Sequence, residues 1–213
     1  WQGMKLSVDN FIKGCLVCQK TTPTPDPRIM GSLVQKSPFD QISIDLFGPV
    51  DPDSQDGSQY ITVFVDNFSR FVEMIPSKST TAEEAKQALL EVIGRHGVPK
   101  SVRTDGGSQF TSHLWYELMS ELGVKHIVTT PDHHQENGQV ERVNREILRQ
   151  LRLHFAAGFP KTDWVKLVPI IMATLNSRVS ERLGRSPMEI LYGRKRNPQV
   201  SLSCDDDSIS PEM

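Results

Sequence analysis

The chain has 213 residues and a mass of 24.0 kDa, which is enough to bury a hydrophobic core without disulfide bonds. Its 37% hydrophobic and 23% charged residues exclude a disordered or fibrous protein. No apolar run approaches the roughly 18 residues that a membrane-spanning helix needs. The net charge of −2 at pH 7 does not by itself indicate a nucleic-acid-binding protein.

The charges are unevenly distributed along the chain. Lys and Arg outnumber Asp and Glu in residues 1–38 and 160–200, whereas acids are in excess in residues 39–159 and 201–213. Basic flanks could contact phosphates while acids of the middle segment bind cations, as a protein that acts on a polyanion would require. The alternative is ordinary fluctuation in charge.

The three cysteines, Cys15, Cys18 and Cys204, cannot all pair with one another, and two of them are only three positions apart. We therefore expect a reducing, intracellular environment rather than a secreted disulfide framework. The sequence opens at Trp1 without the basic and then apolar stretch of a signal peptide, so we expect none. A start inside a longer polypeptide is one interpretation.

Apolar residues at helical spacing predict a helix within residues 5–20. Three prolines between Thr21 and Pro27 then exclude a helix and favour an extended linker. We place this linker at residues 21–36, between an N-terminal segment of residues 1–20 and a domain of residues 37–198. The acidic residues 199–213 are expected to be disordered.

The first part of the domain reads as strands. Alternating apolar residues, rich in β-branched and aromatic side chains, predict strands at residues 39–47, 60–65 and 70–75. Because short connections join consecutive strands, we expect an antiparallel meander.

The pattern then changes to alternating helices and strands. A capping box at residues 81–84 begins a predicted helix that ends between Gly94 and Pro99. Further strands are predicted at 101–105 and 125–128, further helices at 114–122, 138–155, 164–177 and 187–192, and a polar loop at 130–137. We therefore predict an α/β domain whose mixed sheet is covered by helices.

Three acidic residues lie where a strand ends or a helix begins, so that their side chains could face one cleft: Asp45, Asp105 and Glu141. Carboxylates are preferred ligands of Mg²⁺, and two such ions can activate a nucleophile and stabilise a leaving oxygen in phosphoryl transfer. The glycines at 106 and 107 would let a substrate backbone approach. The alternatives are a surface acid ending a strand for Asp45 and a turn residue for Asp105.

The predicted helix at 138–155 separates charged from apolar side chains. Its apolar stripe contains Val140, Val143, Ile147 and Leu151, and its basic stripe contains Arg142, Arg145, Arg149 and Arg152. Because Arg binds phosphate through paired N–H groups, the basic stripe predicts contacts with a nucleic-acid backbone. The alternative is a solvated face with a Glu141–Arg145 ion pair.

The predicted polar loop contains His133 and His134, which we do not assign to a metal because adjacent side chains rarely face one ion. A substrate-facing loop is the better interpretation, and Gln135 and Asn137 could contact DNA. The basic run at residues 194–196 could contact phosphates or aid entry into the nucleus.

Five segments follow one another in an order that is typical of one protein family. They are Ile44-Asp45-Leu-Phe-Gly-Pro49, Val65-Asp-Asn-Phe-Ser-Arg70, Arg103-Thr-Asp-Gly-Gly-Ser-Gln-Phe110, Pro131-Asp-His-His-Gln-Glu-Asn-Gly-Gln-Val-Glu-Arg-Val-Asn144 and Ser186-Pro-Met-Glu-Ile-Leu-Tyr-Gly193. Together they resemble the integrases of retroviruses and, most closely, of gypsy-like long-terminal-repeat retrotransposons.

This resemblance implies a ribonuclease-H-like fold with a mixed five-stranded sheet. It also implies that Asp45, Asp105 and Glu141 form the D,D-35-E triad that binds two Mg²⁺ or Mn²⁺ ions. Such an enzyme trims the 3′ ends of retroelement DNA and joins them to target DNA. The implied partners are DNA and further copies of the chain, without a membrane, and the implied location is the nucleus.

The resemblance also implies that Cys15 and Cys18 end a helical zinc-binding module whose two His ligands lie upstream. None of the six histidines precedes His96, so residues 1–20 would be a truncated remnant of this module. Zn²⁺, which needs four ligands in a structural site, would bind only if the upstream His pair is present. A redox Cys-x-x-Cys pair is the alternative, but its usual βαβ context is missing.

Two other functions stay open for a chain of this kind. One is a hydrolytic nuclease on the same fold, which would produce only cut strands. The other is a non-catalytic or host-adopted DNA-binding protein of integrase origin, against which the intact triad argues.

Overall fold

The computed structural model describes residues 3–15, 37–129, 134–181 and 183–193. The chain divides into two compact units, Trp1–Val34 and Gln35–Met213. The first unit contains helix α1 (Met4–Gly14), in the segment that was predicted to be helical, and its residues Met4, Leu6, Val8 and Phe11 are exposed. The predicted linker at residues 21–36, Cys18 and the predicted acidic tail lie outside the described residues, so these predictions stay untested.

The second unit is built on a five-stranded sheet with the strand order β3-β2-β1-β4-β5. The strands are β1 (Gln41–Phe47), β2 (Tyr60–Asp66), β3 (Val72–Ser77), β4 (Ser101–Thr104) and β5 (Lys125–Val128). β2 pairs antiparallel with β1 and with β3, whereas β4 pairs parallel with β1 and with β5. The predicted meander and the mixed five-stranded sheet are both confirmed.

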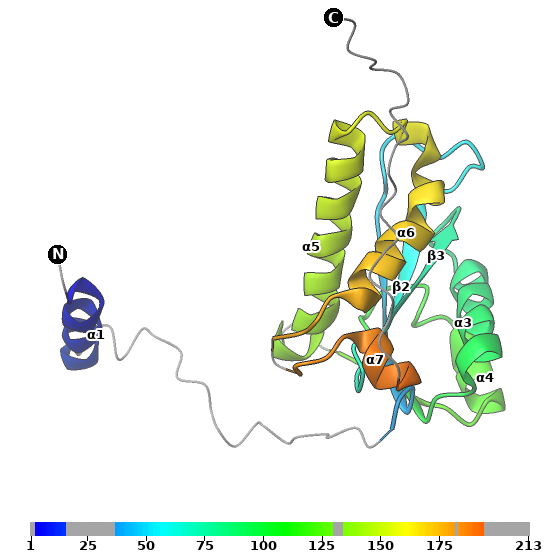
Figure 1. The fold of residues 1–213 in the computed structure, drawn as a ribbon. Helices are drawn as coiled ribbons and strands as arrows, with labels where there is room; N and C mark the ends of the chain where they lie inside the picture. The colour runs from blue at the N-terminus through cyan, green and yellow to red at the C-terminus, as the bar shows by residue number, and fades with distance from the viewer. Residues whose placement is uncertain (1–2, 16–36, 130–133, 182, 194–213) are drawn as a thin grey trace, which may run out of the picture. The chain divides into compact units, whose positions relative to one another are not determined.

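Helices cover both faces of this sheet (Figure 1). Helices α3 (Ala82–His96) and α4 (His113–Glu121) share a hydrophobic layer with Ile44 and Val102. Helices α5 (His134–Ala156) and α6 (Trp164–Ser177) share the opposite layer with Val63. Because successive strand residues point to opposite faces, Asp45 faces the α5 side while its neighbour Ile44 faces the α3 side.

The remaining helical segments are short. A 3-10 turn (Lys161–Asp163) leads into α6, and α7 (Pro187–Tyr192) is begun by a complete capping box at Ser186 and Glu189. α6 and α7 begin and end where the sequence predicted. No helix in the described ranges combines the length and the apolar composition that a lipid bilayer would require.

Helix α5 begins at His134, four residues before the predicted start at Gly138. The predicted loop is therefore wrong for residues 134–137, and His134, Gln135 and Asn137 belong to the helix backbone. A glycine inside a helix costs only about 1 kcal/mol relative to Ala, so Gly138 does not stop the helix. Glu141 lies two turns into α5 rather than in its first turn.

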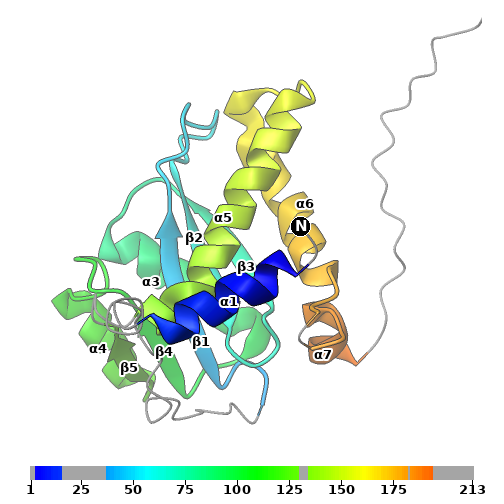
Figure 2. The ribbon, with the colours of Figure 1, turned by 90° about the vertical axis from the view of Figure 1, so that its left-hand side faces the viewer.

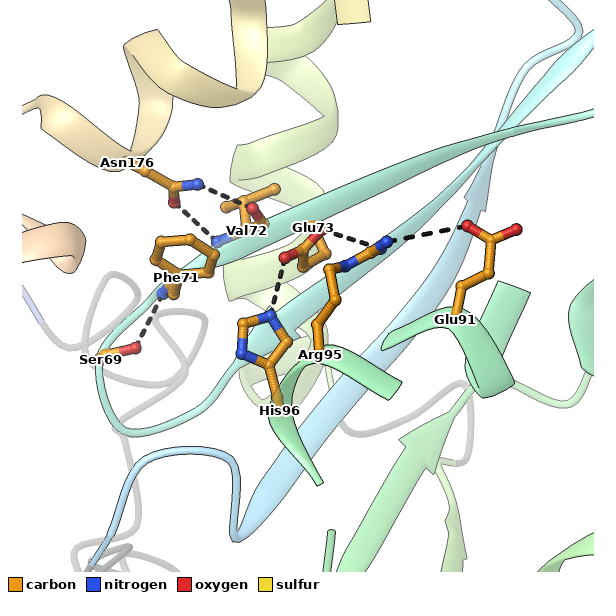
Figure 3. A network of polar contacts seen from close by, with 8 residues as sticks. All are labelled: Ser69, Phe71, Val72, Glu73, Glu91, Arg95, His96 and Asn176. Atoms are coloured by element: carbon orange, nitrogen blue, oxygen red, sulfur yellow. Dashed lines mark hydrogen bonds and ion pairs between the residues drawn. The ribbon is translucent and has the colours of Figure 1, made fainter. Parts of the chain in front are cut away.

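The outer edge of β3 is held by side chains from α6 (Figure 3). Asn176, which is fully buried, accepts a hydrogen bond from the Val72 N–H at 2.8 Å and donates one to the Val72 carbonyl at 2.8 Å. One amide side chain thus satisfies both backbone groups of a residue at the sheet edge, as a further strand would. These bonds fix α6 on β3.

The next residue of β3, Glu73, binds the end of α3 (Figure 3). Its buried carboxylate accepts hydrogen bonds from His96 Nε2 at 2.7 Å and from Arg95 Nη2 at 3.2 Å. The ring of Phe39 stacks on His96 with the centroids 3.9 Å apart. Phe39 has a φ of 58°, which is incompatible with a strand, and β1 accordingly begins at Gln41 rather than at the predicted residue 39.

Replacing Asn176 by Ala should lower the free energy of unfolding by about 2–4 kcal/mol, because both Val72 groups would lose their partner in a buried place. Urea denaturation followed by circular dichroism measures this change. Thr174→Ala, on the exposed side of the same helix, is the matched control and should stay within about 0.5 kcal/mol. Equal stability of Asn176→Ala and the unchanged protein would contradict the role assigned to the amide.

Candidate active site

Asp45 and Asp105 come from two adjacent parallel strands. The last paired residues of β1 and β4 are Ser43 and Arg103. Continued by two residues, the same register brings Asp105, the first residue after β4, opposite Asp45. Since neighbouring strands lie about 4.8 Å apart, the backbones of the two acids lie side by side. Figure 2 shows β1 and β4 beside each other behind α5.

Helix α5 contacts Asp45 through Asn144. Asn144 Nδ2 donates a hydrogen bond of 2.7 Å to Oδ2 of Asp45. Residues three apart lie on the same face of a helix, so Glu141 is on the face of α5 that contacts β1. Sequence reasoning missed Asn144, although its spacing from Glu141 is a signal that could have found it.

The pKa of the Asp45 carboxyl is raised above its ordinary value. Burial of the side chain is the main cause, and the negative charges of Asp105 and Glu141 add to it. The hydrogen bonds from the Leu46 N–H, at 2.8 Å, and from Asn144 act in the opposite direction. Because charges interact strongly only over short distances, the negative charges of Asp105 and Glu141 lie near enough to Asp45 to act on its pKa.

Asp105 is held by its own neighbours in the chain. Its Oδ1 accepts a hydrogen bond from the Gly107 N–H at 3.0 Å, and its carbonyl accepts one from Thr104 Oγ1 at 2.8 Å. A Cβ at Gly107 would come within 2.6 Å of the end of the Gln109 side chain, which would have to move to make room for it. These two bonds hold Asp105 directly after the end of β4.

The three acids do not form a closed metal cage. In the part of the chain that the structure describes, no three His, Cys, Asp or Glu side chains are gathered closely enough to hold an ion. Asp45 and Asp105 are partly exposed and Glu141 is exposed. Each carboxylate oxygen has two lone pairs, so the hydrogen bonds to Asp45 orient it and leave capacity for a further ligand.

The predicted apolar stripe of α5 is confirmed, because Val140, Ile147 and Leu151 are buried against the sheet. The arginines of the basic stripe are all exposed: Arg142, Arg145, Arg149 and Arg152. The alternative Glu141–Arg145 pair does not occur among the ion pairs of the described residues.

Arg149 differs from the other arginines of the stripe. It donates to both carboxylate oxygens of Glu146, at 3.0 and 2.6 Å, and Arg178 lies 3.7 Å from the same carboxylate. The hydrogen bond from Arg149 is the main reason why the pKa of Glu146 is lowered. A phosphate would have to compete with Glu146 for Arg149, which sequence reasoning did not consider.

The other predicted site residues are only partly described. Gln135 and Asn137 lie on the backbone of α5, but their side chains lie outside the described residues, as does His133. Cys15 follows α1 and is partly exposed. The predicted zinc ligands and the DNA contacts of the α5 start therefore stay predictions.

Residues 35–134 match the model of the "Integrase core domain" family. Residues 35–134 form an integrase core domain. The integrase core and its flanking residues are 30% identical over 199 residues to the Pro-Pol polyprotein of Simian foamy virus type 3. This alignment covers 92% of this chain and 17% of the polyprotein. They are 39% identical over 140 residues to the Gag-Pol polyprotein of Woolly monkey sarcoma virus. This alignment covers 64% of this chain and 8% of the polyprotein.

The chain thus spans less than a fifth of the length of these polyproteins. The predicted resemblance to retroviral-type integrases is confirmed by these matches.

Solved integrase structures have the same fold. The HTLV-2 integrase catalytic core domain in complex with magnesium has a TM-score of 0.59 and 24% identity, covering 72% of this chain and 97% of that chain. The simian T-cell lymphotropic virus intasome in complex with PP2A regulatory subunit B56 gamma has a TM-score of 0.67 and 20% identity, covering 100% of this chain and 74% of that chain. The predicted ribonuclease-H-like fold of the integrase core is therefore confirmed.

Replacing Asp45 by Asn should stabilise this integrase core at neutral pH by about 0.5–2 kcal/mol, because it removes a buried charge and its repulsion by Asp105 and Glu141. A carboxyl whose pKa is raised on folding makes stability fall as pH rises from about 4 through the raised value. The gain should therefore grow between pH 4 and pH 7.5, as measured by thermal unfolding. Asp51→Asn, at an exposed acid, is the control, and a gain that is independent of pH would contradict the shared site.

Proposed function

We propose that this integrase core catalyses polynucleotidyl transfer on DNA, with Asp45, Asp105 and Glu141 as the triad that holds two Mg²⁺ or Mn²⁺ ions. The observation that carries the proposal is the geometry: β1 and β4, which lead to Asp45 and Asp105, pair in parallel, and Asn144, one turn after Glu141 on α5, donates a hydrogen bond to Asp45. A partly buried carboxylate whose pKa is raised, as that of Asp45 is, is costly for folding, and a functional site is a frequent reason for such an arrangement.

The side chains present fit a hard divalent cation. Carboxylate oxygens are the ligands that Mg²⁺ prefers, and a cation would favour the ionised form of Asp45, whose pKa is raised by burial and by the nearby negative charges. Asn144 adds a buried oxygen, Oδ1, which has no hydrogen-bond partner among the described residues. Bound by these acids, the ions would supply the positive charge that activates a hydroxyl and stabilises a leaving oxygen.

The contribution of the chain itself is to hold the acids in place. Asn144 and the Leu46 N–H fix the two oxygens of Asp45, and the Gly107 N–H fixes Oδ1 of Asp105. Groups that are oriented before the substrate arrives need little reorganisation during the reaction.

The proposed reaction has two steps, and neither needs a covalent link between DNA and protein. Water first cleaves a phosphodiester near the 3′ end of the retroelement DNA. The new 3′ hydroxyl then attacks a phosphodiester of the target DNA, whose own 3′ oxygen leaves.

The proposed partners are DNA and further copies of the chain. The exposed Arg142, Arg145 and Arg152 could bind phosphates next to Glu141, and Gln135 and Asn137 lie at the start of the same helix. The HTLV-2 core was solved in trimeric and dimeric forms with magnesium, which favours an oligomer and a divalent metal here. We further propose that the protein acts in the nucleus, and that Cys15 and Cys18 bind Zn²⁺ only together with an upstream His pair.

Replacing Glu141 by Gln should reduce strand joining on labelled duplex ends with Mg²⁺ or Mn²⁺ by at least about 100-fold, because the variant lacks one charge of the triad. Glu121→Gln, at an exposed acid on the edge of α4, is the control and should join strands normally. Joining by Glu141→Gln at the normal rate would remove Glu141 from the triad.

The same joining assay separates the proposed reaction from its alternatives. Products that contain only cut strands would indicate a hydrolytic nuclease. Binding of DNA that is independent of metal, without any turnover, would indicate a non-catalytic protein of integrase origin.

Replacing Arg145 or Arg152 by Ala should weaken DNA binding and reduce the slope of log affinity against log salt by about 0.9 per lost phosphate contact. Arg149→Ala should have a smaller effect, because Glu146 already binds its guanidinium. Fluorescence anisotropy of a labelled duplex at several salt concentrations measures both quantities. Unchanged slopes for Arg145→Ala and Arg152→Ala would instead support a solvated helix face.

A further inference from the structure

A chain of hydrogen bonds connects a histidine of β5 to Asp105. His126 Nε2 lies 2.9 Å from Thr104 Oγ1, and Thr104 Oγ1 donates to the Asp105 carbonyl at 2.8 Å. His126 is paired with Val102 across the parallel strands β4 and β5. It is therefore a diagonal neighbour of Thr104 on the same face of the sheet.

A threonine hydroxyl has one proton, and the Asp105 carbonyl can only accept it. When Thr104 donates to this carbonyl, its oxygen accepts from His126, and Nε2 of His126 carries the proton.

The surroundings of His126 fit this neutral form. Its Nδ1 is buried and has no hydrogen-bond partner among the described residues, so a proton there would have no acceptor. Burial accordingly lowers the pKa of His126. The rings of Trp115 and Tyr116 from α4 contact the imidazole edge, with centroids 6.1 and 5.6 Å away, and they limit its rotation.

Thr104 is fixed at its backbone as well. Its carbonyl accepts hydrogen bonds from both the N–H and the hydroxyl of Thr129, each at 2.9 Å. Asp105, by contrast, follows the last residue that β4 pairs with β5. The bond from Thr104 therefore supports the carbonyl of Asp105 at the point where the β4–β5 pairing has ended.

We propose that His126 is a positioning residue for Asp105: it fixes the hydroxyl of Thr104 as a donor to the Asp105 carbonyl and thereby holds Asp105 beside Asp45. The proposal rests on the proposed function, because it assumes that the position of Asp105 matters for binding a divalent cation. His126 lies on the α4 side of the sheet, and it acts through the backbone of β4 rather than by touching the substrate.

A first test reads the tautomer directly. Long-range ¹H–¹⁵N spectra of the labelled full chain at pH 7.5 should show His126 with a protonated Nε2 and an unprotonated Nδ1. The His126→Gln variant identifies the signals by their loss. A protonated Nδ1 with an unprotonated Nε2 would overturn the proposal.

A second test measures binding of Mn²⁺ to the full chain without DNA, by electron paramagnetic resonance of the free ion. His126→Phe keeps an aromatic ring but lacks the donor, and Thr104→Val keeps the shape but lacks the hydroxyl. Each should weaken Mn²⁺ binding by about 5- to 10-fold, near the lower end for residues that orient a metal ligand. His126→Gln and Thr104→Ser, which keep the donor and the hydroxyl, should restore binding to within about twofold.

The double variant distinguishes a chain of hydrogen bonds from two separate packing defects. If His126 acts through Thr104, His126→Phe combined with Thr104→Val should bind Mn²⁺ no more weakly than Thr104→Val alone. Additive losses, or equal losses for His126→Phe and His126→Gln, would overturn the proposal. His113→Phe, at an exposed histidine of α4, is the control for introducing the ring.

Asp105→Asn separates failure of this inference from failure of the proposed function. If Asp105→Asn binds Mn²⁺ normally, the proposed metal site itself is wrong. If Asp105→Asn loses Mn²⁺ while His126→Phe does not, only the positioning role is wrong. Circular dichroism verifies that each variant is folded. If His126→Phe is unfolded, the tautomer test and Thr104→Val decide whether His126 positions Asp105.

Discussion

The parallel pairing of β1 with β4 is the constraint on which the candidate active site depends. It places Asp45, near the end of β1, on the strand beside β4, which Asp105 directly follows. The bond from Asn144 then ties helix α5, with Glu141, to the same place. Two hydrophobic layers maintain this arrangement, because each face of the sheet is covered by its own pair of helices.

The acids at this junction oppose folding, and the surrounding structure compensates for them. Asp45 is a partly buried carboxylate beside two other negative charges, which is unfavourable without a partner. Backbone and amide N–H groups offset a part of this cost, from Leu46 and Asn144 at Asp45 and from Gly107 at Asp105. At the proposed metal site, a cation that binds only the folded chain would also stabilise it, so folding stability and cation affinity would be linked there.

Much of this architecture could be predicted from the sequence, because strands and helices repeat their apolar residues at different periods. The acids Asp45, Asp105 and Glu141 were singled out by their places near predicted strand ends and a helix start, and their role as a triad came from the family resemblance alone. The start of α5 was not predictable, because Gly138 and its polar neighbours mimic a loop. The partners of Asn144, His126 and Asn176 were not predictable either: a single polar side chain has no periodicity, and only the folded sheet brings it to Asp45, Thr104 or Val72. Conversely, the basic stripe suggested four equivalent arginines, whereas Glu146 sets Arg149 apart.

The amide of Asn176 has a consequence far from the acids. β3 is an outer strand of the sheet, and an outer strand with vacant N–H and C=O groups can recruit a strand of another molecule and start aggregation. At Val72 these groups are already occupied by Asn176. Helix α6 thus blocks edge-to-edge association at Val72. This effect on aggregation does not depend on the chemistry at the centre of the sheet.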